Sequence, residues 1–218
     1  MALVVAGFLC FLGWCGSGLV PGERELRPPR AGIEIGSLYF VRERPTDDVS
    51  KPANLERLCT INLARYGVTP KPPQPVADID LLGKLEVEGA LSGLRTELAS
   101  LGVSGSLNNF FEYKLTNVNR VDIDYVDAEK IFKERATRED CLNWRGNIEA
   151  NKWGIYQIQS ISIGDISFSR KREFGVAGDA SAKLGTLEPK LKASIKRTTG
   201  AQFGGKGLVV TFSPIKRN

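Results

Sequence analysis

Histidine is absent from this sequence, and cysteine is scarce, with 4 residues in a chain of 218. Without histidine, the Ser-His-Asp triad, the Cys-His pair and every histidine-ligated metal site are excluded. Four cysteines are also too few for a small protein that disulfides hold together. Charges are balanced, with 30 Lys and Arg against 25 Asp and Glu, and 42% of the residues are hydrophobic. This composition excludes a disordered chain and predicts a globular domain with its own core.

The sequence also lacks a recognisable catalytic motif. Residues 200–206 have the spacing of a phosphate-binding P-loop, but Gly207 stands where the motif needs Ser or Thr. The residues that follow predict a strand, whereas a P-loop opens a helix. Cys59 and Cys141 have no histidine to activate them. We therefore expect no enzyme, no cofactor and no metal site.

Charged side chains are missing from residues 1–22, and residues 2–12 are almost wholly apolar. As a helix rising about 1.5 Å per residue, such a stretch would barely span a bilayer about 30 Å thick. One interpretation is a cleaved secretory signal, because small residues follow at Gly16, Ser17 and Gly18. An uncleaved anchor is the second interpretation, and a misassigned start codon, which would leave the stretch without meaning, is the third.

Arginines follow this stretch rather than precede it, at Arg24, Arg27 and Arg30. The positive-inside bias would then leave the body of an anchored protein in the cytoplasm, whereas a cleaved signal would export it. Cys10 and Cys15 are candidates for acylation at a membrane surface, although Trp14 is too large for the residue that precedes a lipoprotein cysteine. We predict membrane association, with the cytoplasmic face and export both open.

The chain divides into a hydrophobic signal or anchor segment (1–22), a linker (23–32) that Pro28 and Pro29 stiffen, and one α+β domain (33–218). Alternating patterns predict strands at 37–42, 109–117, 120–125, 154–169 and 208–212. Helical spacing predicts a helix at 54–66 and a helical insertion at 127–150. Hairpins join neighbouring strands, which predicts a mostly antiparallel sheet. In an oxidising compartment, Cys59 and Cys141 would be able to pair.

Two longer segments combine strict alternation with small residues, and both predict amphipathic β-hairpins. In residues 174–195, two alternating legs flank a turn at Gly185 and Thr186. Each leg has about ten residues, the length that a tilted transmembrane strand needs. Residues 81–107 alternate in the same way, but Leu91, Leu94 and Leu98 also fit helical spacing. A segment that fits both periods is a candidate for changing structure.

The alternative interpretation of these hairpins is a half-exposed antiparallel sheet, which shows the same two faces. If the hairpins insert into a bilayer, their apolar faces would contact lipid. The side chains predicted to insert are Leu85, Val87, Leu91, Leu101, Val103, Phe174, Val176, Leu184, Leu187, Leu191 and Ile195. Replacing Val176 and Leu191 by Asp is then expected to abolish leakage and to leave the soluble fold intact.

Most of the excess positive charge lies in the last third of the chain, around the clearer hairpin. The candidate lipid-binding residues are Arg170, Lys171, Arg172, Lys190, Lys192, Lys196 and Arg197. A basic patch of this kind suits an anionic membrane, at about 1 kcal/mol per basic residue near the surface. Nucleic acid would suit the charge as well, but no nucleic-acid-binding motif accompanies it, so none is expected.

The order of these elements resembles the pore-forming domain of gasdermins, including bacterial and fungal members. The likeness covers residues 33–212: the strand 38–42, the segment 55–66, the proline-rich connector, the first hairpin, the strand pair and helices that follow, the second hairpin and the closing strand. The resemblance implies binding to acidic lipids, assembly into a homo-oligomer, insertion of both hairpins as a β-barrel, and a role in cell death or defence. It also implies a separate inhibitor or activating protein, since the family generally carries a C-terminal inhibitory domain.

From the residues and the resemblance together, we expect a membrane-associated pore-forming protein that binds anionic lipids and inserts two β-hairpins. The alternative is an exported or membrane-tethered envelope protein that binds a partner as a non-catalytic module.

Overall fold

Three long antiparallel strands form the body of the fold: β6 (Phe111–Asp122), β7 (Gly154–Arg170) and β8 (Gly204–Lys216). The computed structural model describes residues 19–42, 55–103, 105–135, 153–171, 178–200 and 203–217. The strand pairs among them are antiparallel, so the predicted α+β class with an antiparallel sheet is confirmed. The strands predicted at 154–169 and 208–212 lie within β7 and β8.

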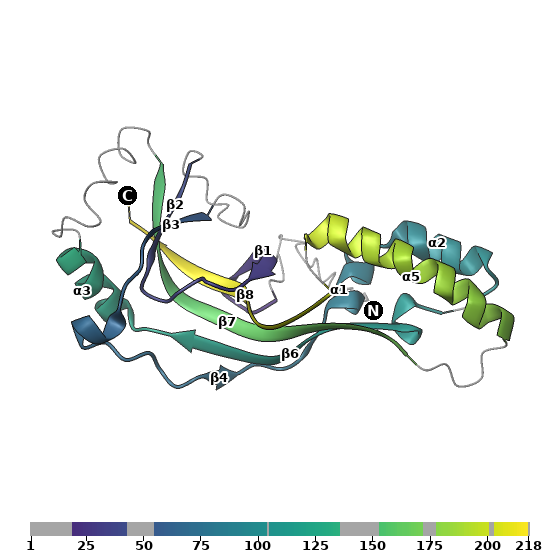
Figure 1. Ribbon diagram of the computed structural model, residues 1–218, viewed down its shortest axis with the longest axis horizontal. Helices are drawn as coiled ribbons and strands as arrows, with labels where there is room; N and C mark the ends of the chain where they lie inside the picture. The colour runs from purple at the N-terminus through teal and green to yellow at the C-terminus, as the bar shows by residue number, and fades with distance from the viewer. Residues whose placement is uncertain are drawn as a thin grey trace, which may run out of the picture.

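β7 lies at the centre of the sheet. One of its edges pairs with β8, and β8 pairs in turn with β1 (Arg24–Arg30). The other edge pairs with β2 (Leu38–Val41) near the start of β7 and with β6 along the rest of the strand. β2 pairs in turn with β3 (Leu55–Cys59). Two short strands, β4 (Gln74–Pro75) and β5 (Ile79–Asp80), cover the outer edge of β6. The sheet bends strongly along β7 (Figure 1).

The pairing of β7 with both of its neighbours is irregular near Asp165. Its side chain accepts hydrogen bonds from Asn117 Nδ2 in β6 and from the Gly207 backbone N–H in β8, both at 2.9 Å. Asn117 and Gly207 both have positive φ, and the registers of β6 and β8 against β7 shift here. The hydrogen bond from Asn117, followed by that from Gly207, lowers the pKa of the Asp165 carboxyl. One carboxylate therefore holds three strands together where their pairing is irregular.

Residues 23–32, for which a linker was expected, contain β1 instead. Pro28 and Pro29 fit there because β1 is an edge strand, where a missing backbone N–H costs little. The strand is anchored by Glu23, whose buried carboxylate accepts hydrogen bonds from Ser160 Oγ (2.6 Å), Ser162 Oγ (2.6 Å) and Thr211 Oγ1 (2.5 Å). Arg120 Nε lies 3.2 Å from the same carboxylate. Glu23 thus ties β1 to β6, β7 and β8.

The helix predicted at 54–66 is wrong. Residues 55–59 form β3, with Leu55 and Cys59 buried, and a 3-10 helix η2 (Leu63–Tyr66) follows. Leu55, Leu58 and Cys59 have helical spacing, but the backbone of this segment forms its hydrogen bonds with β2. Pairing with a neighbouring strand outweighs the local pattern. Gly67 ends η2 in the left-handed conformation. Helix α3 (Tyr125–Arg135) confirms the start of the predicted helical insertion, whose continuation at 137–150 lies outside the described residues.

Two hydrophobic cores occupy the two ends of the molecule. One lies among β1, β2, β3 and α3, and the other lies under the helices α1 (Leu81–Val87), α2 (Ser92–Ser100) and α5 (Gly178–Thr199). Figure 1 shows α3 at one end and these three helices at the other, with the long strands between them. We call the second region the helical end.

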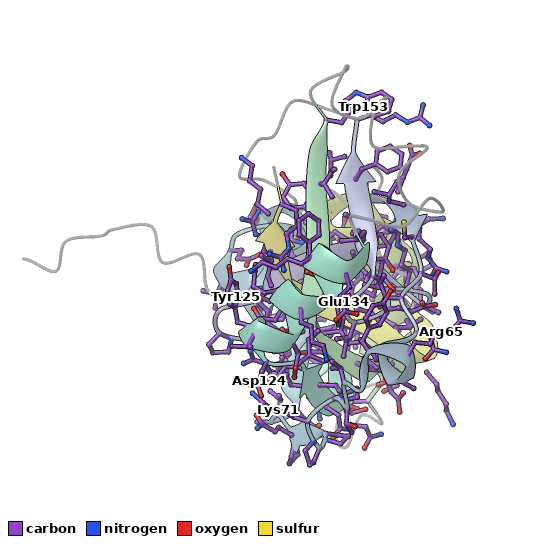
Figure 2. All side chains as sticks on the ribbon, turned by 90° about the vertical axis from the view of Figure 1, so that its left-hand side faces the viewer. Arg65, Lys71, Asp124, Tyr125, Glu134 and Trp153 are labelled. Carbon is purple, nitrogen blue, oxygen red and sulfur yellow. The ribbon has the colours of Figure 1, made fainter. Side chains whose placement is uncertain are left out.

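An ion-pair cluster lies at the end that carries α3. Figure 2 shows Lys71 and Asp124 next to each other below α3. Lys71 Nζ lies 2.7 Å from Asp124 Oδ1 and 3.1 Å from Asp122 Oδ1, which ties the proline-rich connector to the end of β6. Bonding to Asp124, and then to Asp122, raises the pKa of Lys71.

Replacing Glu23 by Ala is expected to lower the free energy of unfolding by about 2–4 kcal/mol, because three buried hydroxyls lose their acceptor and Arg120 loses a counter-charge. Glu56→Ala is the matched control: its carboxylate pairs with Arg42 at the surface, and it should cost no more than about 1 kcal/mol. Urea unfolding measures both. Equal costs would show that the Glu23 contacts do not hold β1.

Candidate functional site: two helical insertions at one end of the sheet

Two segments interrupt pairs of neighbouring strands at the helical end. The first insertion (residues 81–110) lies between β5 and β6, which pair at Asp80 and Lys114. The second insertion (residues 171–203) lies between β7 and β8, which pair at Ser167 and Gly204. β6 and β7 are themselves neighbours and pair at Phe111 and Arg170. Both insertions therefore leave and re-enter the sheet at one end of four adjacent strands (Figure 1).

The two predicted β-hairpins are wrong for this structure. The first insertion forms α1, α2 and a 3-10 helix η3 (Leu107–Asn109), and α5 occupies most of the second. Gly185 and Thr186, predicted as a turn, lie inside α5. The helix satisfies its own backbone hydrogen bonds, whereas a hairpin in water would expose a complete apolar face. Burial against α2 and the sheet therefore favours the helical period of an ambiguous sequence.

The first insertion is closed by polar contacts between its two ends. Asp80 caps α1: its Oδ1 accepts a hydrogen bond from the Gly83 N–H at 3.1 Å, and its Oδ2 accepts one from Asn108 Nδ2 at 2.7 Å. Glu86 Oε1 accepts a hydrogen bond from the Leu107 N–H at 2.8 Å. These contacts bring the start of the insertion next to its end.

A stripe of four apolar side chains holds α5 in place. Leu184, Leu187, Leu191 and Ile195 are fully buried and recur at the spacing of one helix face. They belong to the same core cluster as Leu94 and Leu98 of α2. The predicted variant with Asp at position 191 would therefore not leave the fold intact, because it buries a charge in this core.

Proline 189 weakens α5 from within. It lies in the middle of the 22-residue helix, where it removes one backbone hydrogen bond. Its side chain is exposed, and Gly185, four residues earlier, has the second-poorest helix propensity after proline. The conformation of α5 therefore depends on its buried stripe more than on local propensity.

Lysines tie α5 to its surroundings. Lys190 forms an ion pair with Glu97 of α2, and Lys183 Nζ donates to the Leu101 carbonyl at 3.1 Å. Lys192 Nζ lies 2.6 Å from Glu188 Oε1 and 4.8 Å from the centre of the Phe168 ring in β7. Two predicted lipid-binding residues, Lys190 and Lys192, thus have partners within the protein in this state.

The other predicted lipid-binding residues are spread over the helical end. Arg170 ends β7, Lys171 donates to the Asn108 carbonyl, and Lys196 and Arg197 are exposed in the last turns of α5. Arg172 lies outside the described residues. The described members are all on the second insertion or at its base, but they do not converge on one pocket.

The predicted inserting residues differ in exposure. Leu85, Leu91 and Val103 are buried, Leu101 is partly buried, and Val87 is 89% exposed at the end of α1. Apart from Val87, they belong to the same core cluster as the four side chains of the α5 stripe. Phe174 and Val176 lie outside the described residues.

The strand β1 contacts the first insertion through residues that sequence reasoning missed. Glu25 pairs with Lys84 of α1 and with Arg27, and its side chain and that of Lys84 are 14% and 19% exposed. Burial raises the pKa of the Glu25 carboxyl, but the hydrogen bonds and charges of Lys84 and Arg27 outweigh it and leave the pKa lowered. The prolines of β1 predicted a linker, so no signal in the sequence placed Glu25 beside α1.

Cys59 is buried and disulfide-bonded. Cys141, its predicted partner, and the acylation candidates Cys10 and Cys15 lie outside the described residues, so the pairing and the acylation stay predictions. In the part of the chain that the structure describes, no three metal-ligand side chains cluster together. Within the same residues, the helices are too short or too polar to cross a bilayer.

No protein-family model matches the chain, and no curated protein matches its sequence. Among solved structures, that of a bacterial gasdermin from Bradyrhizobium tropiciagri is similar, with a TM-score of 0.39 and 11% identity. The alignment covers 89% of this chain and 82% of that chain. The gasdermin resemblance expected from the order of elements is thus found again as a likeness of structure only, which says nothing of function.

Replacing Pro189 by Ala is expected to raise the free energy of unfolding by about 1–3 kcal/mol, because it restores a backbone hydrogen bond and favours the helix. Pro70→Ala, in the extended connector, is the control and should not stabilise the protein. Urea unfolding of the two variants measures the difference. A destabilised Pro189→Ala protein would show that the local geometry of α5 requires the proline.

Proposed function

We propose that this protein is a gasdermin-like pore former, whose two insertions leave the helical end and enter an anionic bilayer as β-hairpins. The observation that carries the proposal is the placement of the insertions. Each lies between two neighbouring antiparallel strands, at the same end of one four-strand ladder, β5-β6-β7-β8. Straightening either insertion would lengthen two strands that are already paired, without a change of topology.

The lengths of the insertions suit this change. Each has about 30 residues, which allows two legs of about 13 residues and a turn, whereas a transmembrane strand needs about 9–11. Both legs of each hairpin would continue the register of the strand from which they extend. The extended hairpins would then span a bilayer and still leave residues to connect to the sheet.

The buried stripe of α5 fits both conformations. In the helix, Leu184, Leu187, Leu191 and Ile195 share one face against the core. In a hairpin that turns at Gly185 and Thr186, the same four side chains share the face opposite the lysines. The side chains that hold the helix in water would thus become the lipid-facing side chains of the strand.

Exposed apolar side chains support the same assignment. Val87 is exposed although α1 is otherwise attached through buried leucines. Along an extended first insertion, Val87 would alternate onto the same face as Leu85 and Leu91. Its apolar character has no role in the helical state and would contribute to the lipid-facing surface.

A bilayer permits such strands only in a closed ring, since every backbone polar group in lipid must be paired. Each copy would supply four strands, so the last strand of one copy and the first strand of the next run antiparallel. A ring of identical copies would therefore close with one repeated contact. The proposed partners are other copies of this chain and anionic lipids, which the basic residues of the second insertion would attract.

The first test measures dye release from anionic liposomes and from neutral liposomes. It uses the full chain, because removal of residues 1–30 would delete β1. Release from anionic vesicles alone is expected, since the exposed residues Lys196 and Arg197 favour an acidic surface. No release from either type, by protein that is folded, would contradict pore formation and favour the non-catalytic binding module.

A second test separates insertion from stability by using two adjacent residues. Ala193 is exposed and Ser194 is partly exposed on α5, so a lysine at either position should leave the fold intact. In the hairpin, residue 193 would face lipid and residue 194 would face the lumen. Ala193→Lys should therefore reduce leakage by at least about tenfold, because a lysine on the lipid face costs about 2–4 kcal/mol in each copy.

Ser194→Lys is the matched control and should keep most of the leakage. Circular dichroism and urea unfolding establish that both variants fold like the parent chain. Equal leakage by the two variants would contradict the strand register, whereas loss of leakage in both would point to an effect on the helical state.

A further inference from the structure

We propose that β1 is a strap that holds the first insertion closed, through the ion pair between Glu25 of β1 and Lys84 of α1. This inference rests on the proposed function, because it assigns the contact that must break before the first insertion can leave the sheet. It makes α1 the element that opens first.

The strap is fixed firmly at its own position in the sheet. Glu23 binds hydroxyls of β7 and β8, Leu26 is buried in the core at the α3 end, and β1 pairs with β8. Two residues after Glu23, the Glu25 side chain reaches Lys84 of α1. β1 thus belongs to the rigid part of the molecule, while its partner belongs to a segment that must move.

The contact between Glu25 and Lys84 is largely shielded from water, since both side chains are less than one-fifth exposed. Screening by solvent is weaker in such a place than at the surface, so the pair contributes more than an exposed ion pair. Lys84 also faces Glu88, at 3.8 Å, but Glu88 lies on the same insertion and is more exposed. Of these two carboxylates, Glu25 is the one that lies on β1.

Packing beneath α1 is incomplete, which gives the ion pair its importance. A cavity of about 50 Å³ lies between β1, α1 and the sheet, and its lining includes Leu26, Leu85, Tyr113 and Val210. Its lining is mostly apolar, and it is partly open to solvent. The side chains around it lack contacts on one side, so apolar packing holds α1 less tightly than a filled core would.

α1 itself is a weak helix. It has 7 residues, includes Gly83 and is followed by Gly89 in a positive-φ conformation. A helix of two turns does not persist in water without tertiary contacts. Loss of the strap would therefore release α1 while the long strands remain folded.

Amide hydrogen exchange of the full chain in solution tests the strap without a membrane. Glu25→Gln should accelerate exchange in residues 82–90 by about tenfold, because local opening becomes easier. Exchange in β6 should not change. Glu88→Gln is the matched control, since it removes the other carboxylate near Lys84 but leaves the strap, and it should change exchange in α1 less than about twofold.

Two further variants keep the test decisive. Lys84→Met breaks the pair from the side of α1, and the double variant Glu25→Gln/Lys84→Met should exchange no faster than either single variant, because one contact is lost in each case. Val210→Ile adds a methyl group next to the cavity and should slow the opening of α1. Unchanged exchange in residues 82–90 of the Glu25 and Lys84 variants would overturn the strap.

Dye release from anionic liposomes separates the strap from the pore. The strap predicts faster release by Glu25→Gln than by Glu88→Gln, in the same order as their hydrogen exchange. If α1 opens faster but no variant releases dye, the pore is overturned and the strap stands. If dye is released at one rate by all variants and α1 exchange is unchanged, the strap is overturned and the pore stands.

Discussion

Continuous antiparallel pairing from β5 through β6 and β7 to β8 is the constraint on which the rest of this structure depends. Because neighbouring strands run in opposite directions, the chain must turn back at the ends of the ladder. At the helical end it does so twice, through the first and second insertions. The helices are therefore not an independent layer, since each insertion begins and ends in a strand whose partner is already fixed.

The helices of the insertions result from competition between two regular structures. The α5 stripe is compatible with a helix face and with a strand face, so local sequence favours neither strongly. In water the helix buries the stripe against α2 and the sheet, and its backbone needs no further partner. In a bilayer the apolar face would be solvated by lipid, and the cost of exposing it disappears. The environment would thus decide between the two conformations.

Polar contacts determine how firmly the helical state is held. Lys84, Lys190 and Lys192 each join a helix of the helical end to a carboxylate or to an aromatic ring. Most of these contacts lie within the helical end. Glu25 is different because Glu23 anchors its strand to the rigid sheet. The buried carboxylate of Glu23 thereby fixes the position of Glu25 beside α1, a weak helix.

The sequence by itself determined the antiparallel sheet and the amphipathic character of residues 81–107 and 174–195, because strand alternation and apolar patterning are local properties. It did not determine that these residues fold as helices, since a stripe such as Leu187, Leu191 and Ile195 fits both periods and only burial selects one. Tertiary structure also decided that Glu25 belongs to a strand: the nearby prolines predicted a linker, and pairing with β8 is a contact between distant parts of the chain. The same holds for β3, where the partner strand rather than the spacing of Leu55 and Cys59 set the conformation.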